Sequence, residues 1–128
     1  MKLEEIDKST LKVGDTVGIS VPTQIIWNYF KYSKIIPKTI ARITPARTKF
    51  VTTDGCEYNR HEVFWKVDNE ARKRNHVAEC AKRIEGSLYK LNESLRKGTL
   101  LNKPDDDIIK MAEILKELCK EIEEEQRT

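Results

Sequence analysis

The chain has 128 residues, with 24 Lys or Arg, 21 Asp or Glu and a formal net charge of +3. This length fits one ordinary domain, or a small domain with an appendage, and excludes a multi-domain enzyme. The charge is uneven, because residues 1–66 hold 11 basic and 7 acidic side chains (+4), whereas residues 67–128 hold 13 and 14 (−1). We therefore expect the two halves to have different roles.

Composition also indicates where the protein works. The first ten residues lack the apolar run of a signal peptide, and no stretch of the sequence approaches the ~18 apolar residues of a membrane span. The three cysteines are an odd number and form no C-x-x-C pair, which fits a reducing compartment. We expect a soluble cytoplasmic protein that does not enter a membrane.

The first half has the pattern of short strands. Apolar and small residues alternate over residues 17–21, and residues 39–53 form a predicted hairpin that Pro45 interrupts. Asp54 and Gly55 suit the next tight turn, followed by short strands at residues 56–59 and 63–65. Strands this short favour a small antiparallel β-barrel over residues 1–67. In residues 22–37 the apolar side chains occur at both odd and even positions and do not alternate with polar ones, so this segment is interpreted as a long loop or an edge ribbon.

The second half changes to a helical period. A helix is predicted from near Asp68, a suitable N-cap, to just before Gly98, and a second helix from Pro104 onwards. Short connections between helices favour an antiparallel hairpin, so the fold class is α+β: an SH3-like barrel over residues 1–67 followed by a helical hairpin over residues 68–128. Apolar residues recur every three or four positions at Val77, Ala81, Ile84, Leu88, Leu91 and Leu95, and at Ile108, Met111, Leu115, Leu118 and Ile122.

These two apolar seams have two interpretations. The seams could bury against each other as an ordinary intramolecular core. The first helix, at ~28 residues and ~42 Å, is however longer than the second can cover. The uncovered row of Val77, Ala81 and Ile84 would then pair with a second chain. We expect a homodimer formed through this row.

A second expected surface is basic and aromatic. No acidic side chain occurs between Asp15 and Asp54. Uncompensated cations attract phosphates or acidic protein surfaces, and exposed rings can stack on bases. Nucleic acid, an acidic protein or a nucleoprotein is therefore the expected partner. The alternative is that the lysines only keep the protein soluble and that Trp27, Phe30, Phe50 and Trp65 form the core. The residues expected to bind are Trp27, Tyr29, Lys31, Lys34, Lys38, Arg42, Arg47 and Lys49.

Metal and catalytic chemistry are not predicted. Cys56, His61, His76 and Cys80 have the order of zinc-finger ligands. Cys56 and His61 would, however, lie ~16 Å apart on one extended strand, too far to share a metal unless the chain turns at residues 58–60. His61 and Glu62 are adjacent and would point to opposite faces, so they make no catalytic dyad. We expect no metal, no cofactor and no enzymatic activity.

The hairpin sequence ITPARTKFVTTDG, which begins at Ile43, resembles that of short phage and prophage proteins of Gram-positive bacteria. The resemblance covers roughly residues 11–66, and its motif is an I-T-P-x-R-T-K hairpin. It implies an SH3-like barrel and a setting in the bacterial host cell. Small proteins of mobile elements commonly handle nucleic acid or block host enzymes and defence complexes. The expected function is a non-enzymatic binding or inhibitory protein, such as an anti-CRISPR-like inhibitor, and the alternative is an assembly module that dimerises through its helices.

Overall fold

The computed structural model describes residues 2–126, and the side chains of residues 2–125. The chain forms two compact units, Met1–Glu85 and Gly86–Thr128. Their boundary lies inside helix α1 (Asn69–Lys97). The expected division after residue 67 falls just before this helix begins. The first turns of α1 dock within the first unit: Ala71 and Ala78 are fully buried, and the Asn75 side chain is hydrogen-bonded to the backbone of Ile35.

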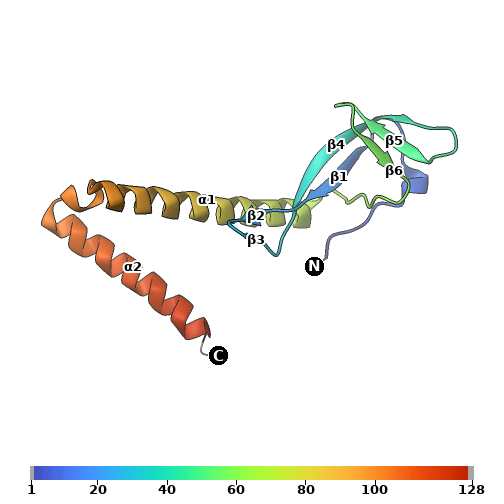
Figure 1. Cartoon of the computed structure of the whole chain (residues 1–128). Coiled ribbons are helices and arrows are strands. Elements are labelled where there is room, and N and C mark those ends of the chain that lie inside the picture. Colours follow the sequence, from blue (N-terminus) through green and yellow to red (C-terminus); the bar gives the residue numbers. More distant parts are fainter. Residues whose placement is uncertain (1, 127–128) are drawn as a thin grey trace. The chain divides into compact units, whose positions relative to one another are not determined.

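The first unit contains a curled antiparallel sheet, a half-barrel, as Figure 1 shows. The predicted α+β class, with a barrel-like sheet followed by two helices, is confirmed. The sheet order is β1-β4-β5-β6, and β2 pairs with β3 as a separate two-stranded ribbon. Ahead of the sheet lies a 3₁₀ turn, η1 (Lys8–Thr10). The strands are β1 (Thr16–Val21), β2 (Gln24–Ile25), β3 (Asn28–Tyr29), β4 (Lys34–Ile43), β5 (Lys49–Thr52) and β6 (Glu57–Asn59).

The predicted hairpin around Pro45 joins β4 to β5, with Ile43 opposite Phe50. Its turn is closed by Thr44, whose Oγ1 accepts the N–H groups of Thr48 and Lys49 at 3.2 and 3.1 Å. Arg47 has φ 55°, a left-handed conformation that tight turns require. The next turn, at Gly55 with φ 87°, leads into β6 as the sequence indicates.

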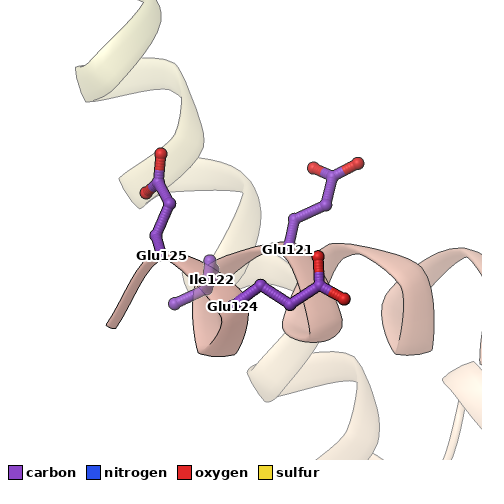
Figure 2. Close-up of a pocket in the computed structure, with 4 residues that line it drawn as sticks. All are labelled: Glu121, Ile122, Glu124 and Glu125. Carbon is purple, nitrogen blue, oxygen red and sulfur yellow. The ribbon is translucent and has the colours of Figure 1, made fainter. Parts of the chain in front are cut away.

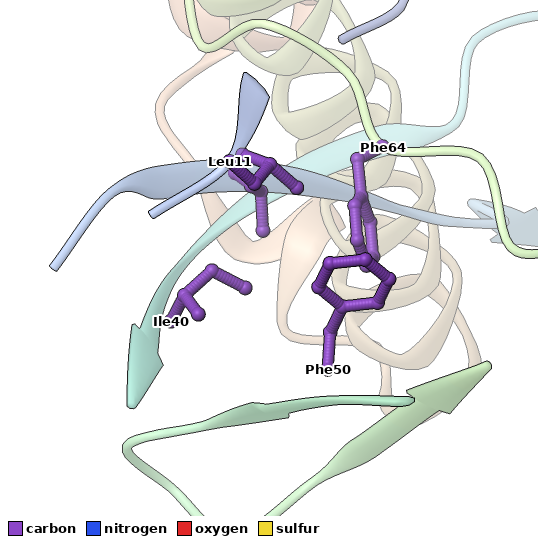
Figure 3. Close-up of a cluster of buried hydrophobic side chains, with 5 residues drawn as sticks. Leu11, Ile40, Phe50 and Phe64 are labelled. Carbon is purple, nitrogen blue, oxygen red and sulfur yellow. The ribbon is translucent and has the colours of Figure 1, made fainter. Parts of the chain in front are cut away.

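The core lies between the strands and the segment that follows them (Figure 3). Phe50 and Phe64 are almost completely buried, and their rings meet edge to face with centroids 5.4 Å apart. Of the four aromatics of the alternative core, Phe50 is buried in this cluster, whereas Trp27 is 90% exposed. Trp65 forms single bridges to Glu5 and Gly18 in place of a last strand. The cluster comprises Leu11, Val17, Ile40, Phe50 and Phe64.

Residues 34–37, expected to be loop or edge ribbon, belong to the central strand β4. Pro37 pairs with Gly18, which directs its N–H and C=O to Trp65 at 2.7 and 2.9 Å. Gly18 therefore makes no hydrogen bond to Pro37. Proline, which has no backbone N–H, is tolerated in a strand where no neighbouring strand accepts a hydrogen bond from it. The absence of a side chain at Gly18 also allows close packing here. A Cβ at this position would lie 2.3 Å from the Ile35 side chain and 2.9 Å from the Trp65 carbonyl oxygen.

β5 pairs with β4 only from Ile40 onwards, so the first half of β4 has an open edge. An unpaired buried backbone group is costly, and this edge is closed by a side chain of α1. Asn75 Nδ2 donates to Ile35 O at 2.8 Å, and Asn75 Oδ1 accepts Ile35 N–H at 2.6 Å. The carboxamide thus replaces a neighbouring strand at one residue and fixes α1 on the sheet.

The second unit contains the last turns of α1, a 3₁₀ turn η2 (Leu100–Asn102) and α2 (Asp105–Gln126). Both predicted helices are confirmed, including the N-cap at Asp68, whose Oδ1 accepts Ala71 N–H at 2.9 Å. Gly98, with φ 80°, follows the end of α1. Across the described residues, neither helix combines the length and apolar composition needed to cross a membrane.

We expect Asn75→Ala to lower the free energy of unfolding by about 2 kcal/mol, because two backbone groups of Ile35 lose their partner. Urea unfolding followed by circular dichroism measures the change. Asn92→Ala is the matched control, since Asn92 is an exposed residue of the same helix. Equal unfolding free energies for the two variants would contradict this role of Asn75.

Candidate partner-binding groove

The β2–β3 ribbon is a tight hairpin with an unusual turn. Gln24 lies opposite Tyr29 and Ile25 opposite Asn28, so Ile26 and Trp27 are the two turn residues. Ile26 has φ 55°, although such turns normally contain glycine, asparagine or aspartate. For a β-branched residue this conformation costs on the order of 1–3 kcal/mol, and such strain persists only where the surroundings hold it in place.

An acidic side chain of α1 holds this turn. Glu85 Oε2 accepts the N–H of Ile26 at 2.6 Å, and Glu85 Oε1 lies 3.1 Å from Lys82 Nζ. The Lys82 ammonium, and then the Ile26 N–H, lower the pKa of Glu85 from its ordinary value of 4.5. Both interactions favour the charged carboxylate, so the turn is attached most firmly when Glu85 is ionised.

A groove of about 590 Å³ lies between the hairpin and α1, within the first unit. We call it the hairpin groove, and it is lined by residues 25–30, Ala81 and Ile84. Its large apolar side chains are open to solvent: Trp27 is 90% exposed, Tyr29 72%, Ile26 65% and Ile84 62%. Contiguous exposed apolar side chains of this kind mark interaction sites in soluble proteins.

The hairpin groove combines residues from two predicted sites. Trp27 and Tyr29 were expected to bind a partner, and Ala81 and Ile84 to form a dimer. The structure brings all four to one cavity. Val77, the third residue of the expected dimer row, is half-buried and does not line it.

Three of the six expected binding cations have partners inside the unit. Lys34 Nζ lies 3.1 Å from Glu79 Oε1. Lys38 forms an ion pair with Asp54, and its hydrogen bond lowers the pKa of Asp54 and raises that of Lys38. The Arg47 guanidinium donates to the carbonyl oxygens of Lys8 and Leu11 at 2.8 and 2.7 Å, which ties the N-terminal segment to the β4–β5 turn.

The other three cations lie at separate places. Lys31 Nζ is 5.2 Å from the centroid of the Tyr32 ring, just after the hairpin. Arg42 is exposed on β4, and Lys49 is exposed on β5. The expected binding residues therefore divide into an apolar group in the hairpin groove and cations distributed over several elements.

The cysteines and histidines do not assemble into a metal site within residues 2–126, where no three candidate ligands converge. Cys56 and His61 are exposed in the β5–β6 region. His76 Nε2 and Cys80 Sγ lie 3.8 Å apart on successive turns of α1. Neither of this pair lines the hairpin groove, so the contact is not aimed at a bound substrate there.

A second depression lies on α2, lined by Glu121, Ile122, Glu124 and Glu125. Figure 2 shows that all four side chains project from one helical segment. Glutamates at neighbouring positions of an exposed helix are the usual composition of a solvated face. We therefore assign no ligand to this depression.

No family model, curated protein or solved structure matches this chain. The resemblance to phage proteins at the β4–β5 hairpin stays a prediction. Functional inference therefore depends on the geometry of the hairpin groove.

We expect the Ile26 amide resonance to titrate with Glu85, with a midpoint below pH 4.5, because the pKa of Glu85 is lowered. A carboxylate with a lowered pKa contributes stability above its unfolded pKa and loses it as the pH falls through its folded pKa. The attachment of the turn should therefore weaken below pH 4.5, as two-dimensional NMR across a pH series would show. Glu85→Gln should abolish the step, and a midpoint above 4.5 would contradict the assignment.

Proposed function

We propose that this protein is a non-enzymatic binding protein that captures an acidic protein segment in its hairpin groove. The observation that carries the proposal is Trp27, which is 90% exposed at the tip of a strained hairpin beside an open apolar cavity. An indole that is exposed to water contributes nothing to the hydrophobic core, so its position needs another explanation. Tryptophan and tyrosine are, however, the residues most enriched among those that dominate protein–protein binding energies.

Pre-organisation supports the same conclusion. The hairpin is attached to α1 through Glu85, so the backbone of the turn that carries Trp27 is already held when a partner arrives. Holding contact residues in the bound conformation reduces the entropic cost of association. The left-handed Ile26 fits this interpretation, because backbone strain is most often maintained at functional positions.

Charge indicates the kind of partner. Residues 1–85 hold 16 Lys or Arg and 11 Asp or Glu, a net charge of +5. This excess attracts an acidic surface and accelerates encounter with it. A protein is favoured over nucleic acid because Lys34, Lys38 and Arg47 are engaged internally and because the groove walls include the aliphatic Ile25 and Ile84.

The biological setting is part of the proposal. The resemblance to phage proteins supports an inhibitory role inside a bacterial host cell, against a complex that handles nucleic acid. Nucleic-acid-binding faces are basic and would repel the positively charged first unit, so the expected contact is an acidic face of such a complex. Blocking such a surface needs affinity and no chemistry, which agrees with a groove that contains aromatic and aliphatic side chains.

We expect Trp27→Ala to weaken binding of the captured partner roughly 30-fold, since a central tryptophan contributes about 2 kcal/mol or more and 1.4 kcal/mol corresponds to tenfold. Tagged wild type, Trp27→Ala, Ile84→Asp and a control variant would be used to capture partners from a bacterial lysate, with and without nuclease treatment. The affinity of each purified partner would then be measured by titration.

Ile109→Asp is the matched control, because Ile109 is a similarly exposed isoleucine (57% against 62% for Ile84) on α2 and is not among the residues that line the hairpin groove. Support requires a protein retained by wild type and Ile109→Asp and lost by both groove variants. Capture that disappears with nuclease would identify nucleic acid as the ligand. Equal retention by all variants would exclude the groove as the binding site.

A further inference from the structure

The helical hairpin of the second unit leaves much of its apolar surface uncovered. Leu91 and Leu95 of α1 are 37% and 49% exposed, and Leu115, Leu118 and Ile122 of α2 are 42%, 49% and 50% exposed. Between the two helices lies an apolar cleft of about 380 Å³, whose lining includes Leu95, Met111 and Leu115. The seams thus do not bury each other, and a monomer would leave this surface in water.

The apolar stripe of α2 is also wider than contact with one helix requires. The seam from Ile108 to Ile122 is flanked on one side by Ala112 and Cys119, which lie about 80° and 60° around the helix from the centre of the seam, whereas Ile109 lies about 140° from it. Ile114, on the other side, lines the cleft and is 61% exposed. A narrow seam suits two helices, whereas a wider stripe is typical of helices that contact two neighbours in a bundle.

The charges of the two helices indicate what covers the stripe. The part of α1 that belongs to the second unit, residues 86–97, carries three Lys or Arg and one Glu (+2), whereas α2 carries three Lys and nine Asp or Glu (−6). When two hairpins pack into a four-helix bundle with like helices on the diagonals, each basic α1 has two acidic α2 neighbours, one from each chain. Opposite charges flanking an apolar seam select partner and orientation in this way.

We propose that the second unit pairs with a second copy of the chain as an antiparallel four-helix bundle, with α1 of one chain against α2 of the other. The interface is the stripe that includes Leu91, Leu95, Leu115, Leu118 and Ile122. This differs from the dimer expected through Val77, Ala81 and Ile84, and it uses no residue that lines the hairpin groove. The inference does not depend on the proposed partner. Such a dimer would carry two grooves and gain avidity for a repeated target.

The test is the mass of the full chain in solution. Light scattering at high micromolar concentration should give twice the mass of one chain, 14.9 kDa, for wild type. Leu118→Asp should give a single chain, because it places a charge in the centre of the stripe. Ile109→Asp is the matched control: Ile109 is on the same helix and similarly exposed, at 57% against 49%, but lies off the stripe, so this variant should remain a dimer.

Three results would overturn the proposal. The first is a wild-type monomer, and this result is decisive even if Leu118→Asp loses helical structure. The second is a dimer that Ile84→Asp dissociates and Leu118→Asp does not, which would move the interface to the hairpin groove. The third is equal dissociation by Leu118→Asp and Ile109→Asp, which would show that charge on any face of α2 has the same effect.

Discussion

The first unit depends on the double hydrogen bond between the Asn75 carboxamide and the backbone of Ile35. The central strand β4 is longer than its neighbour β5, so half of one edge has no strand beside it. Exposed strand edges are usually covered, charged or interrupted. Here the edge is covered by a helix, with an amide side chain replacing the missing backbone, and Pro37 follows where no donor is needed.

Fixing α1 on this edge also creates the hairpin groove. The same helix presents Ala81 and Ile84 opposite the hairpin, and its Glu85 accepts the N–H of the strained Ile26. Sheet stability and the binding surface are therefore linked through one helix. A rigid scaffold that carries an exposed recognition loop is the usual arrangement for binding sites. Trp27 owes its exposed position to the turn that Glu85 holds.

Much of the fold could be predicted because its signals are local. Alternation, the Pro45 break and the helix-ending Gly98 act within a few residues and do not depend on tertiary contacts. The start of β4 could not be predicted, because Pro37 normally argues against a central strand and is tolerated only through the pairing of Gly18 with Trp65. The site was predicted in separate parts for a similar reason: Trp27 and Ile84 meet only in the folded unit. One signal in the sequence could have indicated which face of α1 docks on the sheet. Asn75, a poor helix former, lies between the two buried alanines, Ala71 and Ala78.

Helix α1 supplies the hydrogen-bond partners that the sheet and the hairpin lack. Amide hydrogen exchange of Ile35 and Ile26, resolved by NMR on the wild-type protein, measures whether these hydrogen bonds form in solution. Neither N–H is bonded to another strand, and each is bonded to a side chain of α1. We predict that the Ile35 amide exchanges as slowly as the paired amides of β4 and that the Ile26 amide exchanges more slowly than that of Trp27. Exchange of both at the rate of open, solvent-exposed amides would contradict it.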